Sequence, residues 1–394
     1  MSPWKGIKGE RVIELLIVAG EASGDALGGH LAEAMGRLCP GLRLSGVGGP
    51  AMRSAGVDTW FDVSDLEAVG LFEAAGRLPV LLRVKSRILR EVNAGRFEKA
   101  VLIDYPGFNL HLARSLRVRG VKVVQFVAPQ LWAWGRWRAW KMVRAIDKLL
   151  VILPFEVDFF HGLGIEAVFV GNPLIDLLAN ESHGRDVRRA REKFGLGRDE
   201  GDPIIGLLPG SRASEIASLL PAMLGAAEIL RTAYPNARFL LPVAESLPWD
   251  KIAARAEESG VRPVRGARDV LRASEAALAA SGTATLEAGL LGTPGVIAYR
   301  FHPMTAPLAR LLWNLPPERY YIGLVNILAG EALFPELLQD QMTSDNLAFE
   351  MRRILEDKSR TAYVKQRLAE VQHSLGGPGC FDRAAEAILE TARS

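Results

Sequence analysis

Short apolar runs alternate with longer stretches of helical periodicity along the first half of the chain. Such runs are typical of parallel strands buried on both faces, with helices packed over the two faces of the sheet. The first set of predicted strands covers residues 12–19, 42–47, 100–103, 121–127, 148–152 and 167–170. These runs predict a doubly wound α/β domain.

The same pattern returns in the second half of the chain. A charged helix is predicted over residues 185–194, and a long apolar helix over residues 213–233. The second set of predicted strands covers residues 204–208, 237–242, 262–264, 276–280 and 296–299. We therefore predict two tandem Rossmann-like domains, spanning residues 1–173 and 174–375.

The C-terminal part is predicted to be helical from Ser344 onward, with a break at the Gly-Gly-Pro-Gly segment 376–379. The last segment, 376–394, is predicted to form a helix that crosses back to the first domain. The sequence leaves open whether this helix crosses within one chain or between the two chains of a homodimer.

Composition and charge narrow the class of protein. The chain has 394 residues, 49% of them hydrophobic and 24% charged, and a formal net charge of +3. A net positive charge this small is not typical of a nucleic-acid-binding protein, but it is compatible with anionic substrates or an anionic membrane surface. We find no signal peptide and no uninterrupted apolar run of the ~18 residues that span a bilayer, and therefore expect a cytoplasmic protein. The cysteines, Cys39 and Cys380, lie too far apart in sequence to suggest a zinc site, and are expected to be plain thiols.

The segment 281–300 carries the strongest signal for a phosphate site. Ser281, Gly282 and Thr283 follow a predicted strand at the point where a helix should begin, so free N–H groups and the positive end of a helix dipole would face a pyrophosphate. One helical turn later, Glu287 could accept hydrogen bonds from ribose hydroxyls. The alternative is an ordinary strand, loop and helix with a Ser/Thr cap.

A second glycine-containing turn follows the strand predicted at 204–208. Gly210 and Ser211 allow a phosphate to approach the backbone, and Arg212 offers a guanidinium for bidentate binding. Together the two turns predict a nucleotide site in the second domain. The corresponding turn of the first domain, GEASGD at 20–25, lacks the GxGxxG spacing, which makes an NAD enzyme improbable.

Two carboxylates are candidates for catalysis in the first domain. Asp104 ends a predicted strand at the edge where ligands bind in parallel sheets, and we expect Pro106 and Gly107 to keep it on a loop, where it could act as a general base. Glu21 follows the first strand and could assist it. The alternative for Asp104 is a helix-capping role. Asp25 is expected to cap the helix that follows the GEASGD turn, whereas Glu21 comes too early in the sequence to be a cap.

Two further segments combine apolar and basic residues. In 69–90, an apolar group is followed by Arg83 and further cations, which suits an acyl chain or an anionic bilayer, although a buried amphipathic helix would show the same pattern. The apolar group comprises Val69, Leu71, Phe72, Leu78, Val80, Leu81 and Leu82. The segment 129–141 contains four tryptophans among basic residues. It could stack on sugars, bind phosphate, lie at a membrane interface or bind RNA.

No DxD triplet, Walker A, GxSxG or HExxH motif occurs. We therefore expect no metal and no cofactor, with helix ends and cations such as Arg212 meeting the charge of a leaving group.

Read in order, the motifs GEASGD, IDYPGFN, PQLWAW, LPFE, GNPL, LLPGSR, SGTATLE and VNILAG resemble those of the lipid-A-disaccharide synthase family. The resemblance implies a GT-B fold, with two Rossmann-like domains and a cleft between them, and an inverting, metal-independent glycosyltransferase. It implies transfer of a sugar from UDP-2,3-diacylglucosamine to 2,3-diacylglucosamine 1-phosphate, giving a β-1,6 disaccharide in the lipid A pathway of Gram-negative bacteria. The expected location is the inner face of the inner membrane, as a peripheral protein.

By position, the resemblance makes Asp104 the proposed base, places Arg212 and Glu287 in the UDP site, and puts Asn326 near it. Some relatives carry a second aspartate where Gly107 stands here, so Asp104 is the local candidate. The remaining alternatives are another UDP-sugar GT-B enzyme with a soluble acceptor, and a non-catalytic protein that binds UDP or lipid.

Overall fold

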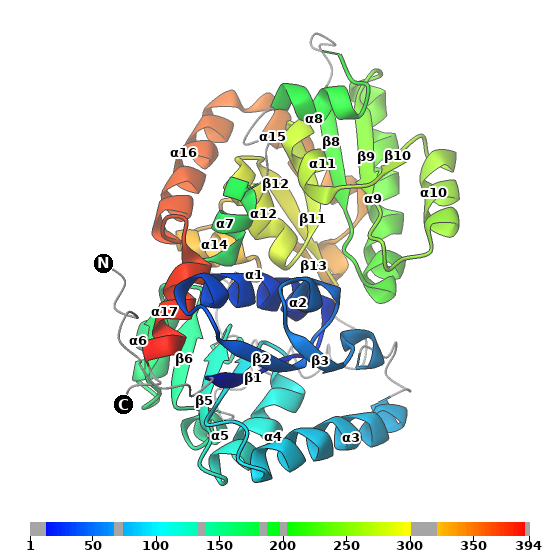
Figure 1. The fold of residues 1–394 in the computed structure, drawn as a ribbon. Helices are drawn as coiled ribbons and strands as arrows, with labels where there is room; N and C mark the ends of the chain where they lie inside the picture. The colour runs from blue at the N-terminus through cyan, green and yellow to red at the C-terminus, as the bar shows by residue number, and fades with distance from the viewer. Residues whose placement is uncertain are drawn as a thin grey trace. The chain divides into compact units, whose positions relative to one another are not determined.

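The computed structural model describes residues 13–66, 74–132, 139–180, 187–197, 203–300 and 321–390. The chain divides into two compact units, Met1–Asn180 with Leu375–Ser394, and Glu181–Ser374. Each unit is built on its own parallel sheet (Figure 1). The first unit thus extends a few residues past the predicted boundary at residue 173.

The first unit carries a seven-stranded sheet in the order β3-β2-β1-β4-β5-β6-β7. Its strands are β1 Glu14–Ala19, β2 Arg43–Val47, β3 Asp58–Phe61, β4 Lys99–Ile103, β5 Lys122–Phe126, β6 Lys148–Val151 and β7 Ala167–Phe169. Its helices are α1 Ala22–Leu38, α2 Pro50–Ser54, α3 Ala74–Asn93, α4 Pro106–Arg117, α5 Ala139–Val143, α6 Glu156–His161, α7 Pro173–Asn180 and α17 Cys380–Glu390, with a 3-10 turn η1 at Val63–Asp65.

The C-terminal helix α17 belongs to this first unit. It lies beside α1 (Figure 1), and its apolar face joins the core formed by α1 and one face of the sheet. Asp176 of α7 accepts hydrogen bonds from the backbone N–H groups of Gly379 (2.6 Å) and Phe381 (3.3 Å) at the start of α17. At the other end, the buried Lys99 donates to the carbonyl of Ile388 at 2.5 Å. Both ends of the helix are therefore fixed by polar contacts.

The second unit carries a six-stranded sheet in the order β10-β9-β8-β11-β12-β13. Its strands are β8 Ile204–Leu208, β9 Arg238–Pro242, β10 Arg262–Val264, β11 Ala276–Ala280, β12 Gly295–Tyr299 and β13 Glu336–Leu338. Its helices are α8 Val187–Lys193, α9 Ala213–Ala233, α10 Trp249–Glu258, α11 Ala267–Ala273, α12 Thr283–Leu291, α14 Leu324–Ala329, α15 Ser344–Glu356 and α16 Lys358–Ser374, with a 3-10 turn η5 at Gln339–Gln341.

All the predicted strands are present, with ends that differ by at most two residues. The strands absent from the prediction, β3 and β13, each lie at one edge of their sheet, whereas the strands at the opposite edges, β7 and β10, were predicted. Neither has a fully buried residue. Because β3 and β13 are exposed or half-buried along their whole length, they lack the continuous apolar run that marks the central strands.

By length and hydropathy alone, α9 is long and apolar enough to cross a membrane, the single such helix among the described residues. Its buried residues, among them Leu220, Met223 and Leu230, belong to the core of the second unit, and it packs against α15. Its apolar character is therefore that of a core helix covering a sheet.

Candidate functional site

In each sheet the strand order changes direction at one point, called here the reversal point. In an open parallel sheet, ligands bind at the carboxyl ends of the two adjacent strands whose connections run in opposite directions. In the second unit these strands are β8 and β11, which pair directly, with Leu208 beside Ala279. Both predicted glycine turns, at 208–212 and 281–283, begin where these strands end.

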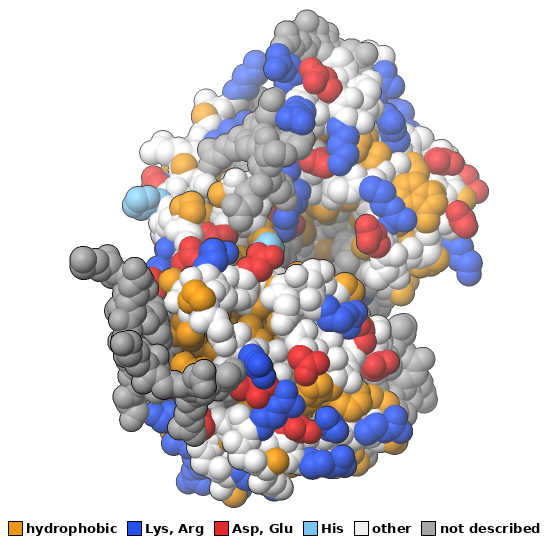
Figure 2. Space-filling model, in the orientation of Figure 1, with side chains coloured by type: hydrophobic (Ala, Val, Ile, Leu, Met, Phe, Trp, Pro, Cys, Tyr) orange, Lys and Arg blue, Asp and Glu red, His pale blue; other side chains and the backbone are white. Residues whose placement is uncertain are grey.

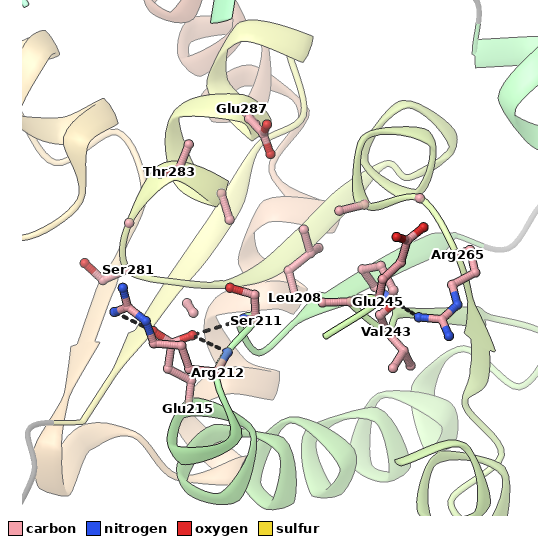
Figure 3. Close-up of a pocket in the computed structure, with 18 residues that line it drawn as sticks. Leu208, Ser211, Arg212, Glu215, Val243, Glu245, Arg265, Ser281, Thr283 and Glu287 are labelled. Carbon is pink, nitrogen blue, oxygen red and sulfur yellow. Dashed lines mark hydrogen bonds and ion pairs between the residues drawn. The ribbon is translucent and has the colours of Figure 1, made fainter. Parts of the chain in front are cut away.

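A cavity of about 530 Å³ lies at this edge (Figure 3). Its walls contain most of the residues predicted for the nucleotide site. These are Gly210, Ser211, Arg212, Ser281, Gly282, Thr283 and Glu287. Helix α12 begins at Thr283, and its N-cap, Gly282, has no side chain that could bond to the first N–H groups. Since Gly282 and Thr283 line the cavity, the positive end of the helix faces it. The prediction that these two turns form one site is consistent with this geometry.

The start of α9 is arranged differently from that of α12. The carboxylate of Glu215 accepts hydrogen bonds from the backbone N–H groups of Ser211 (3.0 Å) and Arg212 (3.2 Å), as the dashed lines in Figure 3 show. Gly210 has a φ of 109°, and a Cβ there would collide with Glu215. The Arg212 side chain is 75% exposed and lines the cavity, and one guanidinium nitrogen lies 3.8 Å from a Glu215 carboxylate oxygen. Most of its N–H donors are therefore open to a ligand.

Glu287 and Asn326 both make hydrogen bonds within the fold, and Asn326 lies away from the cavity near which it was expected. Glu287 lines the cavity, but one of its carboxylate oxygens already accepts from Arg268 Nε at 3.0 Å. Asn326 is fully buried and does not line the cavity. Its amide donates to Phe334 and Glu336 and accepts from the Phe334 N–H, so its polar atoms are used within the fold.

Sequence reasoning missed part of the cavity wall. Glu245 and Arg265 also line the cavity, after the carboxyl ends of β9 and β10. Arg265 donates to the carbonyl of Val243 at 2.7 Å, and its guanidinium lies 4.4 Å from the centre of the Trp249 ring. Ser246 follows Glu245, and Gly266, which also lines the cavity, follows Arg265. These small neighbours, and the position of both residues after parallel strands, are signals in the sequence that could have found them.

In the first unit the reversal point lies between β1 and β4, where Ala19 pairs with Ile103. Asp104 therefore follows β4 beside the GEASGD turn that follows β1. Burial raises the pKa of the Asp104 carboxyl above its usual value, against the opposing effect of the Tyr105 N–H. The Tyr105 ring lies so close to Gly20 that any Cβ there would overlap it. The sheet thus brings Glu21 and Asp104 to one edge.

Three details differ from the sequence analysis. Helix α4 begins at Pro106, with Tyr105 as N-cap, so Pro106 and Gly107 do not delay the helix; proline suits the first helical position because its missing N–H has no partner there. Glu21 occupies the N-cap position of α1 without a side-chain capping bond. Asp25 caps the neighbouring helix α2 instead, accepting from Gly49, Ala51 and Met52 N–H groups.

The LPFE and PQLWAW motifs meet at a buried carboxyl. Glu156 is 2% exposed and accepts from Trp132 Nε1 at 3.0 Å and from the Leu153 N–H at 3.2 Å. Burial raises the pKa of Glu156 to about 7, although these donors oppose the shift. Trp132 also packs edge to face against Phe155. This tryptophan is thus held inside the fold, while the segment 133–138 lies outside the described residues.

The apolar and basic segment is described in part. Val69, Leu71 and Phe72 lie outside the described residues, as does the side chain of Leu78. Leu81 packs partly against the core of the first unit, whereas Arg83 is exposed. No group of three or more His, Cys, Asp or Glu side chains that could hold a metal ion occurs in the described ranges.

Comparison with known proteins identifies the family. The model of the lipid-A-disaccharide synthetase family matches residues 15–388. The lipid-A-disaccharide synthase of Syntrophus aciditrophicus is 41% identical over 380 residues, covering 95% of this chain and 97% of the relative. That of Geobacter metallireducens is 38% identical over 379 residues, covering 95% and 96%.

Solved structures support the fold. UDP-GlcNAc 2-epimerase from Neisseria meningitidis, bound to UDP-GlcNAc, superposes with a TM-score of 0.66 at 11% identity, covering 97% of this chain and all of that one. A UGT transferase from Siraitia grosvenorii in complex with UDP gives 0.58 at 13% identity, covering 96% and 100%. Identities this low establish the architecture alone. The chain has two parallel-sheet α/β domains of the GT-B type, and its sequence matches place it in the lipid-A-disaccharide synthase family of glycosyltransferases.

Proposed function

We propose that the chain transfers 2,3-diacylglucosamine from UDP to the 6-hydroxyl of 2,3-diacylglucosamine 1-phosphate, forming a β-1,6 disaccharide 1-phosphate and UDP. Family membership supports this acceptor over a soluble one and over a non-catalytic binding protein. The structural observation that carries the proposal is the cavity at the β8/β11 reversal point, with a helix N-terminus and Arg212 in its wall.

The second unit would hold the UDP. The diphosphate would sit at the N-terminus of α12, where the first-turn N–H groups and the helix dipole favour negative charge. The Arg212 guanidinium would bind the same oxygens and stabilise the charge that develops as the sugar leaves. The second oxygen of Glu287 would accept from a ribose hydroxyl while the first stays bonded to Arg268.

The first unit would supply the base. Asp104, with Glu21 on the neighbouring strand end, would take the proton from the acceptor hydroxyl while that oxygen attacks the anomeric carbon and the bond to UDP breaks. A single displacement of this kind inverts the anomeric configuration. The raised pKa of Asp104 supports this role because a stronger base accepts a proton more readily, provided the carboxyl is ionised at the working pH.

Helix α3 would meet the inner face of the inner membrane. Leu82, exposed to 56%, and the exposed Arg83 follow one another in the middle of this helix. Over this region Figure 2 shows hydrophobic and basic side chains interspersed on one face. Such a mixture binds the acyl and headgroup regions of an anionic bilayer together. Binding to vesicles with and without anionic lipid, for the wild type and for Leu82→Asp, tests this part separately.

Turnover of the two lipid substrates in detergent, with EDTA present, tests the main proposal. The wild type should form the disaccharide and release UDP, and Asp104→Asn should reduce kcat by about 10²-fold or more while UDP affinity is retained. Asp158→Asn, which removes an exposed carboxylate from the same unit, is the matched control and should be unaffected.

Each outcome has a definite meaning. If the wild type binds UDP but forms no disaccharide with acyl chains of several lengths, the proposed reaction is wrong. If the disaccharide forms and Asp104→Asn turns over at the wild-type rate, the reaction stands and the base is another group.

A further inference from the structure

Three residues at the carboxyl edge of the first sheet have a left-handed backbone although none is glycine. They are Asp104 (φ 44°), Tyr105 (φ 46°) and Val127 (φ 67°), and among the other described residues only Gln339 shares a positive φ without being glycine. Asp104 and Val127 directly follow Ile103 and Phe126, which pair across β4 and β5. Each such residue costs of order 1 kcal/mol or more, with a β-branched valine among the worst cases. Surrounding contacts must therefore hold this edge in place.

Two buried side-chain amides provide these contacts. Gln125 Nε2 donates to the carbonyls of Asp104 (3.1 Å) and Val127 (3.2 Å), and so bridges two of the left-handed residues. Asn109 Nδ2 donates to the carbonyls of Ile103 (3.1 Å) and Asp104 (2.8 Å). Both amide groups therefore converge on the Asp104 carbonyl. Asn109 is 0% exposed and Gln125 is 2% exposed, so water does not compete for these bonds.

The side-chain amide oxygens of Asn109 and Gln125 are in a different situation from the nitrogens. Asn109 Oδ1 and Gln125 Oε1 are buried and have no hydrogen-bond partner in the described structure. A buried acceptor without a partner costs about 1–3 kcal/mol, so neither side chain is placed for stability alone. An amide NH₂ gives two N–H donors from one neutral nitrogen. That is what is required to bind two carbonyls beside a carboxylate without adding charge.

We propose that Asn109 and Gln125 are positioning residues for the transfer reaction, which fix the left-handed backbone of Asp104 and so aim its carboxylate at the acceptor hydroxyl. They act through Asp104 and need not touch substrate. This inference rests on the proposed function, in which Asp104 is the base. A displacement of about 1 Å at a reacting group can cost up to ~10²-fold in rate, so loss of either amide should be visible in turnover.

The test uses Gln125→Met and Asn109→Leu, which are similar in side-chain shape and remove the donors. Each should lower kcat by about 10-fold or more, leave UDP affinity unchanged, and shift the acid limb of the pH profile, because the environment of the Asp104 carboxyl changes. Ser45→Ala is the control. It removes a buried hydroxyl that donates to Glu14 in the same sheet and that makes no hydrogen bond to Asp104, Tyr105 or Val127. It should lose stability but keep kcat and the pH profile.

A double-mutant cycle with Asp104→Asn separates this inference from the proposed function. If Gln125 acts through Asp104, adding Gln125→Met to Asp104→Asn should lower kcat little further, whereas independent effects would multiply. Wild-type turnover in Asp104→Asn alone would remove the base and this inference with it. Loss of activity in Asp104→Asn, with wild-type kcat in folded Gln125→Met and Asn109→Leu, would overturn the positioning role alone.

If Gln125→Met does not fold, Gln125→Glu takes its place because it keeps the shape of the side chain. Its carboxylate has no donor, while its protonated form has one. Its kcat relative to that of the wild type should therefore rise as the pH is lowered, and a ratio that is constant with pH would contradict the positioning role.

Discussion

Replacement of Glu156 by glutamine should make the stability of the first unit less dependent on pH. The pKa of Glu156 is raised from 4.5 to about 7, chiefly because burial disfavours the ionised form. In the unfolded chain the same carboxyl ionises near its ordinary pKa. Between these two values the unfolded state releases a proton that the native state keeps, so the free energy of unfolding falls as the pH rises through this range.

The size of the effect follows from the shift. A difference of about 2.5 units corresponds to about 3.4 kcal/mol at 1.36 kcal/mol per unit, of which about 2.5 kcal/mol falls between pH 5 and pH 8. Glutamine does not ionise, so Glu156→Gln should gain about that much stability relative to the wild type between these pH values. The Trp132 N–H can still donate to the amide oxygen, but the Leu153 N–H competes for the same acceptor. A constant offset at every pH is therefore also expected.

The assay must report on the first unit alone, since a chain with two units need not unfold in one step. Cys39 and Cys380 are both buried in that unit, so pulsed thiol labelling across a urea series measures its unfolding directly. Glu166→Gln is the matched control, because that carboxylate is 61% exposed. If the difference between wild type and Glu156→Gln is the same at pH 5 and pH 8, the carboxyl is not held protonated by burial and the reasoning fails.

Three further predictions concern the two strand edges. Gly20→Ala should lower kcat about 10-fold or more and destabilise the first unit by roughly 1–3 kcal/mol, because its Cβ overlaps the Tyr105 ring; Gly36→Ala, whose Cβ would meet nothing within 4 Å, should do neither in the same turnover and urea experiments. Arg212→Ala should reduce kcat/KM by about 10- to 100-fold, the value of a charge-assisted hydrogen bond, and Arg212→Lys should restore part of it; equal kcat/KM in all three proteins would remove Arg212 from the diphosphate site. The raised pKa of Asp104 predicts that kcat/KM falls on acidification at a pH above the ordinary range of aspartate, since the protonated base is inactive, and a pH profile without this limb in the wild type would contradict its role.

The strands were predictable because most of them are buried on both faces. A central strand such as β8 or β11 is buried at every position, and only an apolar run satisfies that environment. The outer strands β3 and β13 are partly exposed, so their sequences carry no such run. The two turns that line the cavity were predictable for a related reason: each has small residues directly after a buried strand, and this pattern is local in sequence.

The roles of single polar residues were less predictable because their partners are distant in the chain. Asp25 was expected to cap its own helix, but its partners are the N–H groups of Gly49, Ala51 and Met52. Asn326 was placed near UDP by resemblance, but its amide nitrogen donates to Phe334 and Glu336, which lie 8 and 10 positions further along the chain. Glu156 and Trp132 are joined by a contact across 24 positions. Nothing in the local sequence distinguishes these residues from ligand-binding ones.

Structural and ligand-binding polar residues differ in this chain in how many of their hydrogen-bond donors and acceptors are already used within the fold. Asn326 uses its amide nitrogen and oxygen inside the fold, so it has little to offer a ligand. Arg212 shares its guanidinium with one carboxylate at 3.8 Å and presents the rest to the cavity, beside a helix N-terminus that no side chain caps. Gln125 lies between these cases, with its donors used and its acceptor empty. The donors of Gln125 hold the backbone of Asp104, so the effect of this residue on turnover should be visible through the carboxylate that this backbone carries.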